Sequence, residues 1–166
     1  MNNAKRIAIV PGSFDPITNG HLYLIEKASA EYDRVFVAVM INPEKKYMFT
    51  IEQRKAIAEA CVDGMENVEV ISSEGWLWEL AKSLGACAIV KGYRNEIDLE
   101  YERKMAEFNE DKYPQAKTVL IKSEDDLSQL SSTAVRNLIL SESSIEKLVP
   151  QNAIDEIQRI IKQKTE

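Results

Sequence analysis

The residue type most suited to chemistry occurs once: His21 is the only histidine in the chain. It ends a Gly- and Pro-containing stretch, residues 11–21, that follows an apolar run at residues 7–10. A strand that leads through such a loop into a helix leaves backbone N–H groups free, and the helix dipole favours an anion there. Imidazole, with an ordinary pKa of ~6.5, donates a hydrogen bond when neutral and carries charge when protonated. A solitary histidine is more often a packed or surface residue, but this setting favours contact with a phosphate.

A second helix start with chemical groups lies at residues 131–136. Its sequence is Ser131-Ser132-Thr133-Ala134-Val135-Arg136. One hydroxyl is enough to cap a helix. Three in succession, with the free N–H groups of a first turn, predict a second phosphate cradle that Arg136 assists from one turn further on.

Three cations follow predicted strands. Lys45 comes just after the strand at 35–41, inside a charged run that also fits a solvated surface cluster. Lys91 and Arg94 follow the strand at 88–90. They fit an anion clamp, although Arg94 also has Glu96 and Asp98 close by as surface ion-pair partners.

The elements that must position these groups alternate along the chain. Apolar, β-branched runs at residues 7–10, 35–41, 68–71, 88–90 and 119–121 predict five strands, and helical patterns lie between them. This order predicts an α/β fold: a Rossmann-like, doubly wound five-stranded parallel sheet with helices on both faces, in a single domain over residues 1–166. Such sheets bind ligands at the carboxyl ends of their strands. We therefore expect the loops at 12–21, 42–49, 91–94 and 123–132 to meet at one edge.

Several helix signals are specific. Thr50 with Gln53 predicts a capping box, and Gly85 predicts the end of a helix over residues 76–84. Ile97, Tyr101, Met105 and Phe108 form a helical stripe that suits either the core or an interface, as do Trp76 and Trp78. In the last helix we expect Ile154, Ile157 and Ile161 to point inward.

Composition excludes several classes of function. The net charge is −6 and no basic tract stands out, so we expect no nucleic-acid partner. Cys61 and Cys87 are distant from each other and lack neighbouring histidine, which predicts inert thiols in a reducing compartment and no zinc site. The N-terminal apolar run is too short for a signal peptide or a membrane span. We expect a cytoplasmic protein without membrane contact.

Taken together, these motifs resemble the nucleotidyltransferase superfamily. The shared elements are Thr18-Asn19-Gly20-His21 and the run from Ser131 to Arg136. The chain is closer still, nearly end to end, to the bacterial phosphopantetheine adenylyltransferase family. That similarity rests on residues 11–21, on Asn42-Pro43-Glu44-Lys45-Lys46-Tyr47-Met48-Phe49-Thr50, on Gly92-Tyr93-Arg94, and on Asp98-Leu99-Glu100-Tyr101-Glu102.

The resemblance implies an enzyme, pantetheine-phosphate adenylyltransferase, which converts ATP and 4′-phosphopantetheine into 3′-dephospho-coenzyme A and pyrophosphate, the penultimate step of coenzyme A synthesis. It implies direct in-line attack of the substrate phosphate on the α-phosphorus of ATP. The attacking phosphate is already ionised near neutral pH, so no general base is required. The resemblance further implies magnesium with ATP, with no protein ligand to the metal identified, together with a homohexamer and feedback binding of coenzyme A.

Residue roles follow from the same resemblance. The catalytic set is His21, Ser13, Lys45 and Arg94, with His21 stabilising the transition state. The phosphopantetheine site comprises Ser13, Lys45, Leu77 and Lys91. The ATP site comprises Ser13, Phe14, His21, Gly92, Tyr93, Arg94, Glu102, Leu127, Ser128, Gln129, Leu130, Ser131, Ser132 and Thr133.

The chain departs from the family pattern in places. Lys91 replaces a usual arginine, which loses the bidentate fork for phosphate. Leu127 replaces a frequent aromatic, Tyr47 a frequent proline and Ser13 a threonine. Two alternatives stay open: another small, cytidylyltransferase-like nucleotidyltransferase, and a non-catalytic adenine-nucleotide-binding protein. The region around Lys45 and residues 91–94 favours the phosphopantetheine enzymes over the first. Retention of His21 argues against the second.

Overall fold

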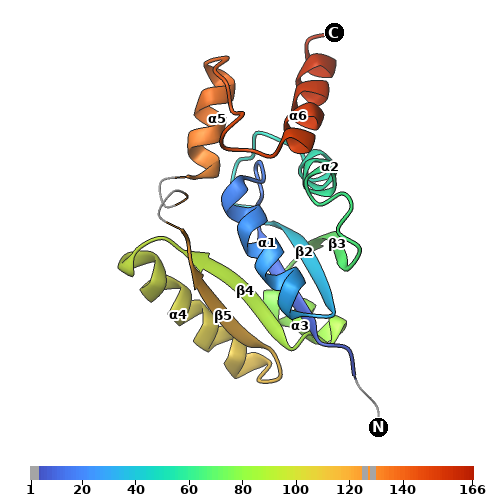
Figure 1. The fold of residues 1–166 in the computed structure, drawn as a ribbon. Helices are drawn as coiled ribbons and strands as arrows, with labels where there is room; N and C mark the ends of the chain where they lie inside the picture. The colour runs from blue at the N-terminus through green and yellow to red at the C-terminus, as the bar shows by residue number, and fades with distance from the viewer. Residues whose placement is uncertain (1–3, 125–126, 128–129) are drawn as a thin grey trace.

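The computed structural model describes residues 4–124, 127 and 130–166 (Figure 1). Strands and helices alternate along most of the chain, and two helices end it. The order is β1 (Ile7–Gly12), α1 (Asn19–Glu31), β2 (Arg34–Ile41), α2 (Ile51–Cys61), β3 (Val68–Glu74), α3 (Leu77–Leu84), β4 (Ala88–Tyr93), α4 (Glu96–Lys112), β5 (Lys117–Lys122), α5 (Ser132–Leu140) and α6 (Gln151–Lys164).

The strands form one parallel sheet in the order β3-β2-β1-β4-β5, which confirms the predicted doubly wound fold. The chain winds outward from β1 to β3, crosses to β4 and winds the other way, so the order reverses between β1 and β4. Pairing of β1 with β2 runs from Ile7 to Gly12. Pairing of β1 with β4 is restricted to Ala8 with Ala88 and Ile9 with Ile89. The neighbouring strands β1 and β4 therefore diverge toward their carboxyl ends.

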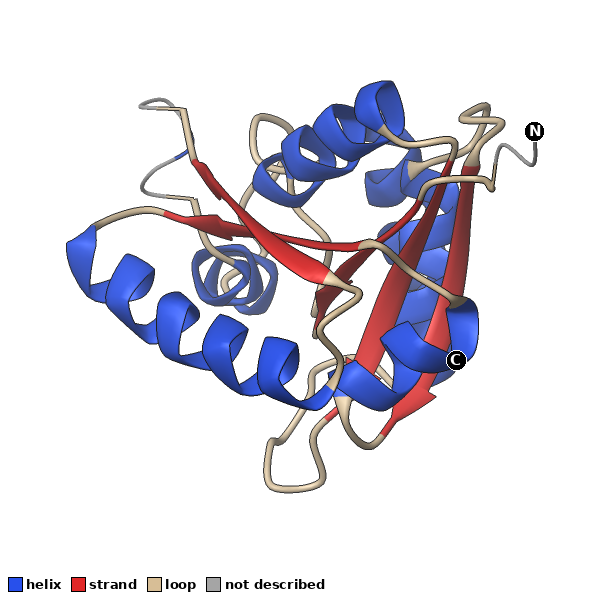
Figure 2. Ribbon diagram, turned by 90° about the horizontal axis from the view of Figure 1, so that it is seen from below, coloured by secondary structure: helices blue, strands red, loops and turns tan. Residues whose placement is uncertain are grey.

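Helices cover both faces of the sheet (Figure 2). Two apolar clusters hold the layers together, one on each face. Ala8 and Val10 of β1 point into the cluster that contains residues of α1, α2, α5 and α6. Ile9, between them, points into the opposite cluster with Ala81 of α3. This alternation is what a parallel strand covered on both faces requires.

Local signals at two helix ends are confirmed. At the start of α2, Gln53 N donates to Thr50 Oγ1 at 3.2 Å and Thr50 N donates to Gln53 Oε1 at 3.0 Å, which is the predicted capping box. Gly85 follows α3 with φ of 64°, in the left-handed region that glycine adopts without strain.

Some expected boundaries and orientations were wrong. Gly12 belongs to β1 and Asn19 begins α1, so His21 lies in the first helical turn and not in a loop. Residues 91–93 are still part of β4. In α6, Ile160 is buried at 3% exposure whereas Ile161 is 36% exposed, so Ile161 does not point inward. Positions 160 and 161, three and four residues after Ile157, both fit a helical stripe. Packing against α2 buries Ile160.

The stripe on α4 faces away from the core. Ile97 and Tyr101 are 81% and 61% exposed, and Met105 and Phe108 are also exposed. Trp76, just before α3, is exposed as well, and its ring centroid lies 5.4 Å from that of Phe108. We call these residues the α4 apolar face. Within the described part of the chain, no helix is long and apolar enough to cross a membrane.

Candidate active site

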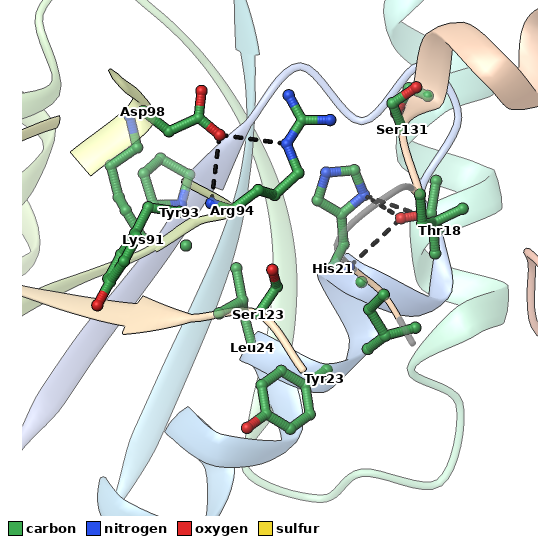
Figure 3. A pocket seen from close by; sticks show the side chains of 16 residues that line it. Thr18, His21, Tyr23, Leu24, Lys91, Tyr93, Arg94, Asp98, Ser123 and Ser131 are labelled. Carbon is green, nitrogen blue, oxygen red and sulfur yellow. Dashed lines mark hydrogen bonds and ion pairs between the residues drawn. The ribbon is translucent and has the colours of Figure 1, made fainter. Parts of the chain in front are cut away.

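A pocket of about 300 Å³ opens where β1 and β4 diverge (Figure 3). Its walls come from the ends of β1, β4 and β5 and from the first turns of α1 and α5, which is where a doubly wound sheet binds ligands. The lining residues are Pro11, Thr18, Gly20, His21, Tyr23, Leu24, Lys91, Gly92, Tyr93, Arg94, Asp98, Ser123, Leu127, Leu130, Ser131 and Ser132.

The start of α1 fixes the orientation of His21. Thr18 caps the helix, and its Oγ1 accepts from His21 N at 3.4 Å. In return, Thr18 N donates to His21 Nδ1 at 3.0 Å. A backbone N–H can only donate, so Nδ1 carries no proton and the proton of the neutral ring resides on Nε2. The capping box therefore leaves a single ring donor, Nε2–H, for the pocket.

The surroundings keep this imidazole neutral. Desolvation lowers the pKa of His21 to about 4. The buried Phe14 ring packs edge-on against it, with centroids 4.9 Å apart. Phe14 itself has a positive φ of 49°, and a Cβ at Gly12 would come within 3.1 Å of its ring. Glycine at position 12 thus makes room for the aromatic support of His21. Phe14 itself lies outside the lining set.

The start of α5 uses its hydroxyls differently from our expectation. Ser131 Oγ caps the helix by accepting from Ala134 N at 3.0 Å, and Ser132 Oγ donates to Pro16 O at 2.8 Å. Thr133 Oγ1 accepts from Arg136. The Ser131 and Thr133 hydroxyls bond within the start of α5, and the Ser132 hydroxyl bonds to the loop after β1. The part of this start that suits an anion is therefore the backbone N–H groups of the first turn.

Arg136 lies outside the pocket lining and contacts the loop after β1. Its Nη1 donates to Asp15 O at 2.8 Å and lies 3.8 Å from the Asp15 carboxylate. That buried carboxylate also accepts from Met48 N at 2.9 Å and Phe49 N at 3.0 Å. Arg136 and Asp15 together connect α5, the loop after β1 and the loop before α2.

The β4 side of the pocket supplies two cations. Lys91 Nζ lies 2.8 Å from Glu102, and Arg94 Nε donates to Asp98 at 3.2 Å. Arg94 therefore both pairs with a carboxylate and lines the pocket. Between them, a Cβ at Gly92 would lie only 3.0 Å from Leu24 Cδ1, so glycine allows α1 to approach β4 closely.

The other predicted site residues lie outside this pocket lining. Lys45 is exposed in the loop after β2, and Leu77 packs with the α3 side of the core. Ser13 accepts through its carbonyl from Arg54 Nη1 at 2.8 Å. Glu102 pairs with the lining residue Lys91, and Thr133 Oγ1 accepts from Arg136. Ser128 and Gln129 lie outside the described residues.

Sequence reasoning missed two kinds of residue. Thr18, Tyr23, Leu24, Asp98 and Ser123 line the pocket, and of these Thr18 had a signal: its spacing from His21 is that of a capping box with histidine in place of Gln or Glu.

Arg54 was also missed. Only 2% exposed, it donates to Ser13 O and Met40 O and stacks on Tyr47 at 3.8 Å. It holds the loop after β1 against the end of β2.

The pocket offers hydrogen-bond donors and cations more than metal ligands. Among the described residues, no three His, Cys, Asp or Glu side chains are grouped so as to hold a metal ion. A neutral imidazole N–H, two helix N-termini and two cations are groups that stabilise negative charge on a phosphate in transfer.

Comparison with known proteins places this chain in a class. Residues 9–138 match a family model described as cytidylyltransferase-like. A solved structure, a protein assigned as a nicotinate-nucleotide adenylyltransferase from Vibrio parahaemolyticus, superposes with a TM-score of 0.72 over 94% of this chain and 93% of that one. At 20% identity this similarity shows the fold alone. The chain is a nucleotidyltransferase.

Curated relatives define the family more narrowly. The chain is 40% identical to the phosphopantetheine adenylyltransferase of Clostridium perfringens (strain SM101) over 94% of this chain and 95% of that protein. It is 43% identical to that of Alkaliphilus oremlandii over 89% of this chain and 94% of that protein. The chain belongs to the phosphopantetheine adenylyltransferase family.

Proposed function

We propose that the protein transfers the adenylyl group of ATP to 4′-phosphopantetheine, giving 3′-dephospho-coenzyme A and pyrophosphate. The observation that carries this proposal is the neutral His21, whose only N–H donor is left for a pocket where the first turns of α1 and α5 meet. The relatives named phosphopantetheine adenylyltransferase supply the identity of the two substrates.

In the proposed step, an oxygen of the phosphopantetheine phosphate attacks the α-phosphorus of ATP. The bond from the α-phosphorus to the bridging oxygen breaks, and pyrophosphate leaves with the electron pair. The attacking oxygen carries no proton near neutral pH, so the protein needs to align the reactants and stabilise charge. His21 Nε2–H donates to a non-bridging oxygen of the α-phosphate, where negative charge develops.

The remaining groups serve the substrates. The first-turn N–H groups of α5 and Arg94 bind the β- and γ-phosphates, and Lys91 with Lys45 and Ser13 binds the phosphate of phosphopantetheine. Glu102 and Asp98 hold Lys91 and Arg94 in place before substrate arrives. Magnesium enters as MgATP, bound by phosphate oxygens and water, and screens the charge of the leaving pyrophosphate.

The direct test is pyrophosphate release with MgATP and 4′-phosphopantetheine, compared with MgCTP and a phosphorylated alcohol such as glycerol 3-phosphate. We expect turnover with the first pair only. Turnover with CTP alone would establish the cytidylyltransferase alternative. ATP binding without turnover on either pair would establish a nucleotide-binding protein.

We also propose that the protein self-associates through the α4 apolar face, as a homohexamer, and that coenzyme A binds the substrate site as a feedback inhibitor. The exposed Ile97 and Tyr101 support the interface, since patches of this kind mark contact surfaces. Light scattering of the wild type and of Ile97→Lys tests it. A hexamer that Ile97→Lys dissociates is the expected result, and a wild-type monomer contradicts it.

A further inference from the structure

A hydroxyl in the pocket has no assigned role. Ser123 follows β5 directly, and its backbone N donates to Tyr93 O at 3.0 Å, which fixes it beside the end of β4. Its side chain lines the pocket, and its Oγ is buried without a hydrogen-bond partner among the described residues. Figure 3 shows this hydroxyl pointing into the pocket, on the Arg94 side of His21 and away from Ser131.

A buried hydroxyl without a partner destabilises a fold unless something else satisfies it. The other serine and threonine hydroxyls of the pocket lining already have partners: Ser131 Oγ accepts from Ala134 N, Ser132 Oγ donates to Pro16 O, and Thr18 Oγ1 contacts His21. Ser123 therefore stands out as a group whose partner is a ligand. In ligand pockets, a few such polar groups among apolar walls set orientation and specificity.

The neighbours of Ser123 indicate which part of the ligand it meets. Among the groups suited to phosphate, His21 and the α5 N-terminus come from the helix starts, and Lys91 and Arg94 come from the end of β4. Ser123 comes instead from the β5 end, and the pocket lining also includes the apolar and aromatic side chains of Leu24, Tyr93 and Leu127. Apolar and aromatic walls suit a base and ribose better than a triphosphate.

We propose that Ser123 Oγ hydrogen-bonds the nucleoside part of the bound ATP. This rests on the proposed function for the identity of the nucleotide. The chemistry required of the ligand is a hydrogen-bonding group on the ribose or on the base edge.

Calorimetric titration of MgATP and of magnesium tripolyphosphate tests the proposal without requiring turnover. Ser123→Ala is compared with Thr118→Val, which removes another buried, unpartnered hydroxyl, on β5 and outside the pocket lining. We expect Ser123→Ala to weaken ATP binding on the order of fivefold, the effect of one neutral hydrogen bond. It should leave tripolyphosphate unchanged, and Thr118→Val should affect neither.

Unchanged ATP affinity in Ser123→Ala, or equal weakening of ATP and tripolyphosphate, would overturn the proposal. Analogues altered at one ribose hydroxyl or one base-edge group then identify the partner. An analogue that lacks the group bound by Ser123 should bind the wild type more weakly than ATP does. The same analogue should bind Ser123→Ala no more weakly than ATP does. Coupling with none of them would also overturn the proposal. Because the wild-type turnover assay is separate, failure of the overall function is distinguishable from failure of this role for Ser123.

Discussion

The first turns of α1 and α2 are built alike and serve different ends. In each, a threonine hydroxyl accepts from the backbone N–H three residues later, and the side chain at that position accepts from the threonine N–H. In α2 the returning group is the Gln53 amide, which does not line the pocket, so its remaining N–H groups have no such site to serve. In α1 it is the His21 imidazole, which still has Nε2–H to offer. The same local structure thus caps a helix and sets the tautomer and direction of a side chain that lines the pocket.

Location makes the second role possible. The α1 start lies where β1 and β4 diverge, so its third residue borders a pocket, whereas Gln53 is not among the pocket residues. A histidine can hold its place through Nδ1 and act through Nε2 because the two ring nitrogens point in different directions. The orientation of His21 therefore uses hydrogen bonds that the helix start needs in any case.

The largest effect is expected when His21 is replaced by glutamine, the residue at the matching position of α2. His21→Gln gives α1 the cap that α2 already has, so we expect thermal stability to remain close to that of the wild type. The Gln amide also carries N–H groups, but its flexible side chain does not hold them at the position of the rigid imidazole Nε2–H, so kcat should fall about 100- to 1,000-fold, while the ATP dissociation constant changes only a few-fold. Steady-state kinetics and calorimetry measure this. An equal loss in kcat and ATP affinity would instead make His21 a ground-state ligand.

Removing the cap hydroxyl separates capping from orientation. Thr18→Val and Thr50→Val should each lower the unfolding free energy by about 1 kcal/mol, the usual effect of losing an N-cap. Only Thr18→Val should also lower kcat, on the order of tenfold, because the imidazole is then less well fixed. Thr18→Ser should restore both properties. Equal kcat for Thr18→Val and Thr50→Val would show that Thr18 does not orient His21.

The smallest effect should come from the reverse exchange. Gln53→His places a second imidazole in the same cap but away from the pocket. We expect kcat to stay within twofold of the wild type, because position 53 lies away from the pocket whatever side chain caps the helix. A larger change in pyrophosphate release would mean that the α2 start contributes directly to the site.

The fold and much of the site could be predicted because their signals are local. Alternating strands and helices leave few arrangements other than a doubly wound parallel sheet. The carboxyl ends of its strands then bring His21, Lys91, Arg94 and Ser131 to one edge, which is where the structure has them. Capping at Thr50 and termination at Gly85 depend on residues within one turn.

The rest depended on partners far along the chain. Arg54 and Arg136 bind the backbone carbonyls of Ser13 and Asp15, which are 41 and 121 residues away in sequence. A carbonyl oxygen has no side-chain signature, so no pattern marks it as a partner. Ser132 likewise donates to Pro16 O. In the structure, these contacts hold the α5 start against the loop after β1.

The central claim is that His21 is a neutral Nε2–H donor. Because the chain has one histidine, ¹⁵N NMR of imidazole-labelled protein reports it without overlap. We predict the Nε2–H tautomer in the free protein and an apparent pKa well below the ordinary 6.5, about 4. The unfolded chain then binds the proton first, so folding stability should also fall as the pH drops from about 6.5 toward 4. An Nδ1–H tautomer, or a pKa at or above 6.5, would contradict the account.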